Sequence, residues 1–468
     1  MFIVAATTPG AEDLSIHSRL DRPEAQRLST RDCLDQTSIL DESVSNTDGC
    51  AANGEQNWGN ATMTIDVDVA EQFEKHLSSP KQTWLLGAGV SFPANIPLMY
   101  ALTARVLAVA RSKLFHEDPA ALRILKFIEE DCGENSHIEH HLTHLGDLIS
   151  IAARSRTGGI MIGGEHVSKD KLIEVHRGLI GEIAAAVRWG FKAARKNADG
   201  AITDPEVVGT NGKSIVDIVG HKQFISAVFG SNRAGLDFVR TPVEFFTTNY
   251  DTLIEDALAL AGVEFQDGFV GGGVGFWNIR NYSATGGTRA IVSKLHGSVD
   301  WYQPSSGSPS MLRVRNGDTY PGEGGSVMIY PQATKYVNTQ RDPFAEIFQR
   351  FRQRLSQGND HVVLACGYSF GDDHINAEFE IAMASAKNQL TVVAFSDEPN
   401  DELPPTLRKW QSEPWGQRLF IASPKGLYQG QKGPFFPDPN GRRSWWTFEG
   451  VSKLLASGLP KDILEAMA

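Results

Sequence analysis

The chain has 468 residues, of which 41% are hydrophobic and 21% charged, and its formal net charge at pH 7 is −12. This length allows one large domain with insertions or two to three ordinary domains, and the negative charge argues against a broad nucleic-acid-binding surface, which needs a dense face of lysine and arginine. No apolar run is long enough to cross a bilayer and the first residues lack the basic flank of a secretory signal, so we expect a soluble cytoplasmic protein that does not bind membranes.

Cysteine usage argues against two further classes. The cysteines are too few and too far apart for a disulfide framework or for the paired C-x-x-C motifs of zinc modules. They are Cys33, Cys50, Cys132 and Cys366. We therefore expect no cysteine-based zinc site.

The first packed elements are predicted after residue 60. Residues 1–60 are rich in Ser, Thr, Asp, Asn and Gly, which favours a mobile N-terminal arm. A helix is predicted over residues 67–77 and a strand over residues 83–86, and two glycines follow that strand in Gly87-Ala88-Gly89-Val90-Ser91. Glycine lets a backbone turn sharply and approach a pyrophosphate. A tight turn without a ligand has the same requirement.

A long region of helical character occupies residues 100–240, and we expect a helical insertion there. Its helices are predicted over residues 102–114, 121–130, 138–153 and 172–194. The third of them carries His140, His141 and His144, and His137 directly precedes it. A histidine pair at i, i+4 can bind zinc, but a pocket wall or a solvated helix face explains the cluster better.

Strand-like runs then alternate with helical or loop segments, at residues 243–247, 290–295, 327–330, 361–366 and 390–395. This alternation predicts an α/β fold: a Rossmann-like, doubly wound, mostly parallel sheet that carries the helical insertion. Polar motifs follow three of these strands, at residues 247–251, 295–298 and 367–376. Because the carboxyl ends of parallel strands share one edge of a sheet, the motifs are expected to converge with the glycine turn on one cleft.

Three other features have competing interpretations. Arginines around residue 345 predict an amphipathic helix with a solvated basic face rather than a nucleic-acid strip; they are Arg341, Arg350, Arg352 and Arg354. Asp372, Asp373 and Asn376 are metal-ligand types, but they lie where a helix is expected to start, and acidic residues stabilise a helix N-terminus. Residues 399–468 form a C-terminal extension whose tryptophans pack on the core or form an assembly surface; they are Trp410, Trp415, Trp445 and Trp446.

Together, the motifs resemble those of the sirtuin superfamily, and most closely its sirtuin-like NADase branch of bacterial anti-phage defence. The sirtuin Gly-Ala-Gly-Ile-Ser segment with its later Gly-Ile-Pro is matched by residues 87–97, and Thr-Gln-Asn-Ile-Asp by residues 247–251. Leu-His-Gly is matched by residues 295–297, Gly-Thr-Ser by residues 367–369, and the ribose-contacting turn by residues 396–398. The resemblance implies a sirtuin-like NAD-binding and catalytic domain over residues 61–398.

Two departures argue against a protein deacylase. Leu98-Met99-Tyr100 replace the sirtuin Asp-Phe-Arg, and the sequence has no four-cysteine zinc module of the deacylating sirtuins. Cleavage of NAD needs only the dinucleotide and water, whereas deacylation needs a platform for an acyl-lysine peptide. The resemblance therefore implies an NAD⁺ hydrolase that yields ADP-ribose and nicotinamide, with NAD as substrate and no zinc.

The resemblance also implies roles for particular residues. Asn249 would hold the nicotinamide carboxamide or position the attacking water, His296 would accept a proton, and Asp251 would orient a ribose hydroxyl or Asn249. The alternative is structural, with Asn249 and Asp251 capping the following helix and His296 a satisfied buried residue. Contacts with NAD are implied for Gly87, Ala88, Gly89, Ser91, Thr248, Gly367, Ser369 and Asp397.

The resemblance also implies partner proteins. The resemblance implies a homo-oligomer that depletes NAD as a defence effector with a HerA-type ATPase/DNA translocase or, less readily, an Argonaute-type protein. The helical insertion and the C-terminal extension are the surfaces we assign to assembly. The alternative functions are an NAD-dependent deacylase or ADP-ribosyltransferase, and a non-catalytic sensor of NAD or ADP-ribose.

Overall fold

The computed structural model describes residues 58–134, 136–196, 202–230, 241–282, 287–303, 311–315, 326–329, 343–358, 361–438 and 441–467. Most of the predicted N-terminal arm lies outside the described residues. Its last three residues, 58–60, belong to helix α1 (Trp58–Leu77).

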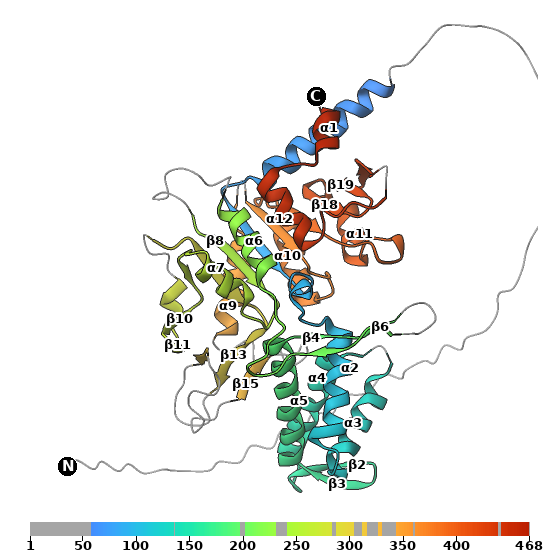
Figure 1. Ribbon diagram of the computed structural model, residues 1–468, viewed down its shortest axis with the longest axis vertical. Helices are drawn as coiled ribbons and strands as arrows, with labels where there is room; N and C mark the ends of the chain where they lie inside the picture. Colours follow the sequence, from blue (N-terminus) through green and yellow to red (C-terminus); the bar gives the residue numbers. More distant parts are fainter. Residues whose placement is uncertain are drawn as a thin grey trace, which may run out of the picture. The chain divides into compact units, whose positions relative to one another are not determined.

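A nine-stranded sheet forms the centre of the fold (Figure 1). Its strands, in spatial order, are β20 (Lys432–Phe435), β19 (Gly426–Gln429), β18 (Leu419–Ser423), β17 (Thr391–Phe395), β16 (Val362–Cys366), β1 (Gln82–Leu86), β8 (Val243–Thr247), β12 (Ala290–Lys294) and β9 (Phe265–Gln266). All neighbours from β18 to β9 are parallel, and β19 and β20 extend the sheet in antiparallel fashion. The predicted α/β fold with a mostly parallel sheet is confirmed.

Both faces of the sheet are covered, which is why its central strands are continuous apolar runs. Trp84 and Leu86 point into one core, and Leu85 points into the other. Helices α1, α6 (Val219–Phe229), α7 (Leu253–Leu260) and α12 (Phe448–Ser457) cover the first face, and the short α13 (Lys461–Met467) follows. Helices α9 (Phe344–Leu355), α10 (Asp373–Ala384) and α11 (Pro405–Ser412) cover the second.

The helical region has its own hydrophobic core. It contains α2 (Met99–Val109), the π-turn η3 (Ala110–Leu114), α3 (Pro119–Cys132), α4 (Ile138–Arg154) and α5 (Lys169–Trp189), with the hairpin β2 (Gly159–Ile162) and β3 (Glu165–Ser168) between the last two. Two short ribbons follow, β4 (Phe191–Lys192) with β7 (Val207–Val208), and β5 (Arg195–Lys196) with β6 (Ile202–Asp204). Helix α6 falls inside residues 100–240 but packs on the main sheet beside α12, so the separate helical unit ends before α6.

A second, five-stranded sheet was not expected from the sequence. It consists of β10 (Phe269–Gly271), β11 (Val274–Trp277), β14 (Leu312–Val314), β13 (Gly297–Gln303) and β15 (Ser326–Ile329). The strand predicted at residues 327–330 in the parallel sheet is therefore wrongly placed, because β15 pairs antiparallel with β13. An apolar run predicts a buried strand but not its partner or direction.

The arginines of α9 correct a second interpretation. Arg350 lies 2.6 Å from the carboxylate of Glu244, which is buried in β8, and Arg354 contacts the same oxygen. Arg352 alone of the described three is well exposed, and it pairs with Glu378 on α10. A buried carboxylate needs cationic partners, so most of the predicted solvated face instead anchors α9 to the sheet.

The C-terminal extension is part of the central fold. It supplies three strands of the main sheet and helix α12. Trp410, Trp415 and Trp445 are buried in the two cores, and Trp446 is half-buried against the first. Among the described residues, no helix has the length and apolar character needed to span a membrane.

Replacing Trp445 by phenylalanine tests this integration. The Trp445 indole N–H donates to Ser423 O at 2.7 Å, and its ring lies 6.1 Å from that of Phe73. Loss of the hydrogen bond and of ring volume is expected to lower the free energy of unfolding by about 1–2 kcal/mol. Chemical denaturation measures it, with the half-buried Trp446→Phe as matched control. Equal, negligible effects of both changes would contradict the packing described here.

Candidate active site

The glycine turn follows β1, the strand at which the strand order of the sheet reverses. From β1 the chain builds β8 and β12 on one side and β16 to β18 on the other, and such a switch point leaves a crevice at the carboxyl ends of the strands. Gly87 N donates to Cys366 O at 3.0 Å, and Gly89 N donates to Gly367 O at 2.9 Å. The turn after β1 is thus fastened to the turn after β16.

Close packing explains why glycines occupy this turn. A Cβ on Gly87 would lie 2.4 Å from Gly367 O, and one on Gly89 would lie 2.7 Å from Gly367 Cα. Gly367 itself has a φ of +64°, a value that favours glycine. The N–H groups of both turn glycines are used inside the protein, whereas Ala88 is exposed. The turn therefore offers a ligand mainly the backbone around Ala88.

Asn249 is held against the glycine turn by its own side chain. Its Nδ2 donates to Gly87 O at 3.0 Å and to Ser91 Oγ at 2.8 Å. Ser91 Oγ in turn donates to Asp251 Oδ2 at 2.7 Å, and Asp251 Oδ1 accepts from Leu253 N at 3.0 Å. Asn249, Ser91 and Asp251 are thus linked to Gly87 by consecutive hydrogen bonds, as their expected convergence on one cleft would require.

The side-chain oxygen of Asn249 is the unsatisfied atom of this hydrogen-bonded group. Asn249 is only 7% exposed, and its Oδ1 has no hydrogen-bond partner among the described residues. A buried, unpaired amide oxygen is costly unless a ligand or water satisfies it. Because both Nδ2 hydrogen bonds fix the carboxamide, Oδ1 is a pre-oriented acceptor beside the glycine turn.

His296 reaches the same edge from β12. Lys294 is in register with Thr247, so His296 and Asn249 each lie two residues beyond paired positions of adjacent strands. His296 Nε2 lies 3.0 Å from Asp372 Oδ2, and Asp372 follows β16. Strands β12 and β16 are separated by β8 and β1, about 14 Å or three strand spacings. The His296–Asp372 contact therefore passes over the ends of β1 and β8.

Asp372 was expected to stabilise the start of a helix, and it does. Its Oδ1 accepts from His374 N at 3.0 Å and Ile375 N at 3.4 Å, which makes it the N-cap of α10. Asn376 bonds the Tyr368 hydroxyl and Phe370 O. Within the described ranges, no group of three or more His, Cys, Asp or Glu side chains is arranged to hold a metal ion. The contact of Asp372 with His296 was not foreseen.

The remaining predicted binding residues lie along the same edge. Thr248 is half-buried, and its N–H donates to Leu86 O at 3.0 Å. Ser369 is exposed just beyond Gly367. Asp397 is exposed after β17, two strands from β1, and lies 3.9 Å from Arg442. Thr248 thus lies on the β8 side of the glycine turn, and Ser369 and Asp397 lie on the β16 and β17 side.

Two buried side chains, Glu139 and Lys294, bond residues of the Asn249–Asp251 segment. The Tyr250 hydroxyl donates to Glu139 of α4 at 2.5 Å, and burial, followed by the Glu139 charge, raises the pKa of Tyr250 well above its usual value. Lys294 contacts Asp251 O and lies 3.4 Å from Glu255. Burial raises the pKa of Glu255, and the positive charge of Lys294 partly offsets this rise. The sequence offered no signal for either contact, since both partners are distant in the chain.

The histidine cluster lies at the start of α4. His137 is the N-cap residue, and its ring stacks on that of His140 at 3.8 Å. His141 Nε2 lies 2.7 Å from Ser136 Oγ, and burial lowers its pKa to about 4. His144 lies 3.0 Å from Asp131. These contacts divide the cluster among capping, a hydroxyl and a carboxylate.

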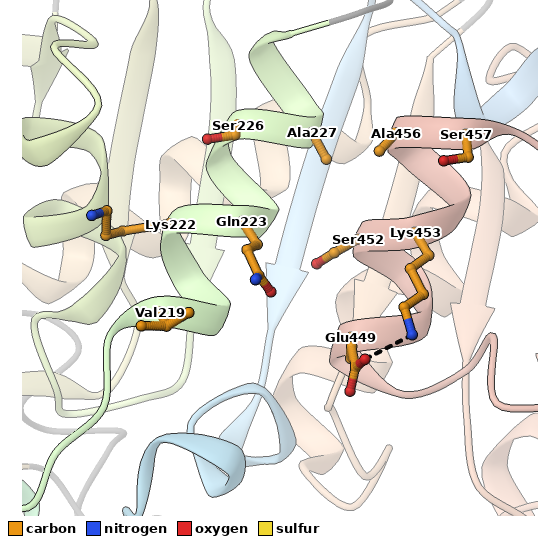
Figure 2. Close-up of a pocket in the computed structure, with 10 residues that line it drawn as sticks. All are labelled: Val219, Lys222, Gln223, Ser226, Ala227, Glu449, Ser452, Lys453, Ala456 and Ser457. Carbon is orange, nitrogen blue, oxygen red and sulfur yellow. Dashed lines mark ion pairs between the residues drawn. The ribbon is translucent and has the colours of Figure 1, made fainter.

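Two cavities lie away from this edge. A groove of about 720 Å³ runs between α6 and α12 and is lined by small and polar side chains (Figure 2). A smaller cavity of about 140 Å³ lies near the amino ends of β1, β8 and β16, where Gln82 and Thr83 contribute to it. Neither is lined by the predicted catalytic or NAD-binding residues, although Glu244 and Arg354 contribute to the smaller one.

Part of the chain matches a known family model. Residues 243–415 match the family model of the SIR2-like domain. This range includes Asn249, Asp251, His296 and Asp372 but not the glycine turn. The match supports, over these residues, the sirtuin-superfamily resemblance drawn from the motifs.

Individual proteins are only distantly similar. A Sir2 homologue solved as a complex with NAD is 11% identical, with a TM-score of 0.34, and the alignment covers 85% of this chain and 95% of that one. A mutant Sir2 homologue solved with ADP-ribose is 13% identical, with a TM-score of 0.30, and covers 72% and 88%. No curated protein matches the chain.

Proposed function

We propose that this protein is an NAD⁺ hydrolase that releases nicotinamide and ADP-ribose. The observation that carries the proposal is Asn249 Oδ1, a buried and pre-oriented acceptor without a partner among the described residues, next to the turn after β1. Such an atom suits the task of holding an attacking water or a ribose hydroxyl. The SIR2-like domain match over residues 243–415 supports an NAD-utilising activity at this edge.

The proposed reaction uses the two motif residues in complementary roles. The bond between C1′ of the ribose and the nicotinamide nitrogen breaks, and nicotinamide leaves as a neutral molecule with the bonding electron pair. A water oxygen, held by Asn249, bonds to C1′, and its proton passes to His296. Positive charge develops on the ribose in the transition state, so fixed dipoles and a base are needed rather than a strong nucleophile. Asp251, through Ser91, keeps the Asn249 carboxamide in place.

The binding residues follow from their positions along the edge. Ala88 would lie at the pyrophosphate, Gly87 and Gly89 would shape the turn that presents it, and the buried Ser91 would support this turn through its bonds to Asn249 and Asp251. Thr248 would lie toward the nicotinamide ribose. Gly367, Ser369 and Asp397 would lie toward the adenosine, in that order from β16 to β17. The resemblance to sirtuins supplies the part of NAD that each residue would contact, and the strand order gives the relative positions of these residues.

Two other functions make different predictions. A deacylase or an ADP-ribosyltransferase would cleave NAD only when an acceptor is present. A sensor of NAD or ADP-ribose would bind without cleaving. The free acceptor on Asn249 can bind water or a ribose hydroxyl, so the preference for hydrolysis over deacylation is drawn from the sequence, which has no four-cysteine zinc module.

Chromatography of NAD⁺ incubated with the purified protein separates these functions. We expect nicotinamide and free ADP-ribose in equal amounts without any peptide. Release only with an acylated peptide or a protein acceptor would favour the transferase class, and binding without release would favour the sensor. His296→Ala in the same assay should show whether activity belongs to this edge.

The cellular role is proposed from the resemblance alone. It comprises defence against phage by NAD depletion in the cytoplasm, a homo-oligomeric assembly, and restraint or activation by a HerA-type ATPase. The buried tryptophans leave the helical unit as the better candidate for an assembly surface. Adding the partner and DNA to the NAD assay, with the mass of the assembly measured by light scattering, tests this role.

A further inference from the structure

His296 and Asp372 form a buried pair at the proposed site. The two side chains are 6% and 4% exposed, and His296 Nε2 lies 3.0 Å from Asp372 Oδ2. The partners come from opposite sides of the strand pair β1 and β8. Nothing in the local sequence requires this pairing, because a helix cap needs only one carboxylate oxygen.

We infer that Asp372 is the positioning residue for His296, holding the imidazole with its proton on Nε2 so that Nδ1 is the nitrogen that accepts a proton. This inference rests on the proposed function. A hydrogen bond at one ring nitrogen of histidine determines which nitrogen carries the proton. A carboxylate in that position also stabilises the imidazolium formed when the ring takes up a second proton.

Hydrogen bonds to one carboxylate oxygen and to the backbone oxygen hold Asp372 in place. Oδ1 accepts from the first backbone N–H groups of α10, a twelve-residue helix whose positive N-terminal end favours an ionised carboxylate. The backbone oxygen of Asp372 accepts from the Tyr368 hydroxyl at 3.3 Å. Oδ2 therefore faces His296 from a fixed position, as a base-orienting group must.

The proton balance of the step is simple. When the proton of the attacking water moves to Nδ1, the ring gains one positive charge while Asp372 keeps its negative charge and its hydrogen bond. The proton on Nε2 does not transfer. After ADP-ribose leaves, Nδ1 returns its proton to solvent.

Replacing Asp372 by asparagine isolates this role from capping. Asparagine is as good an N-cap as aspartate, so its amide oxygen keeps the bonds to α10. Its amide N–H₂ then faces His296 Nε2 and favours the opposite tautomer. Asp373→Asn is the matched control. Asp373 is exposed, and its replacement removes the same charge from the same turn of the helix.

The test combines NAD turnover with ¹⁵N NMR of the ring nitrogens of His296. We expect Asp372→Asn to lower kcat about 10²-fold with ADP-ribose affinity nearly unchanged, and to move the ring proton from Nε2 to Nδ1. Asp373→Asn should do neither. The double variant with His296→Ala should be no slower than His296→Ala alone, because the two residues act as one unit.

Several outcomes would overturn the inference. They are wild-type kcat in Asp372→Asn, an unchanged tautomer, or additive losses in the double variant. Should Asp372→Asn fold poorly, Asp372→Ser keeps a capping oxygen and removes the second one. A wild-type protein that cleaves no NAD would defeat the proposed function, whereas the tautomer measurement would still decide the role of Asp372.

Discussion

Replacing Asn249 by alanine is expected to lower the rate of nicotinamide release about 10³-fold, close to the background. The change removes the free acceptor Oδ1 and both hydrogen bonds of Nδ2, to Gly87 O and Ser91 Oγ. Loss of one oriented polar group at a developing charge typically costs this much in kcat. The affinity for ADP-ribose should change far less, because binding is shared along the whole edge. Steady-state chromatography and calorimetry measure the two quantities.

Two further variants make the Asn249 result specific. Asn249→Asp keeps an acceptor but loses the donors to Gly87 O and Ser91 Oγ and adds a charge near Asp251, so it should also be inactive. Thr252→Ala is the matched control, since Thr252 is nearby and bonds only Asp256 among the contacts that the structure gives. An Asn249→Ala protein that keeps more than about a tenth of wild-type kcat would show that Asn249 does not act in the chemical step.

Replacing Gly87 by alanine is expected to abolish activity and to lower the free energy of unfolding by about 3 kcal/mol. The added Cβ would lie 2.4 Å from Gly367 O and 2.6 Å from Tyr368 Cα, both of which are backbone atoms that a rotamer change cannot move. The turns after β1 and β16 must then separate, at the upper end of the usual cost of overpacking. Asn249 loses its Gly87 acceptor in the same movement.

The control for Gly87→Ala is Gly272→Ala, in the turn between β10 and β11. A Cβ there meets nothing within 4 Å, so stability and activity should be unchanged. Thermal unfolding and NAD turnover measure both variants. A stable, active Gly87→Ala protein would contradict the close approach of the two turns.

Local sequence pattern was enough to predict the strands that carry the site. β8 was predicted with its exact bounds, and β1, β12, β16 and β17 to within one residue at an end, because parallel strands buried on both faces are continuous apolar runs. The pairing of β15 and the incorporation of residues 419–435 into the main sheet could not be predicted. They depend on strand order, which is decided by contacts between segments far apart in the sequence.

Some contacts of the site could be predicted from the sequence, and others could not. Asn249, Ser91 and Asp251 could be grouped from the sequence because each lies within five residues of the end of a predicted central strand. The cap on α10 was also visible, as an aspartate at the expected helix start. The pairing of that aspartate with His296 was not, because it joins loops on strands separated by two others. The Tyr250–Glu139 bond was hidden for a similar reason.

The proposed function requires that Asn249 and His296 meet at C1′ of a dinucleotide bound at the turn after β1. A crystal structure with ADP-ribose would show whether they do. We expect the pyrophosphate at Ala88, the adenosine toward Asp397, and the terminal C1′ hydroxyl within hydrogen-bond distance of Asn249 Oδ1. ADP-ribose bound elsewhere, for example in the groove between α6 and α12, with Asn249 Oδ1 still unpartnered, would contradict it.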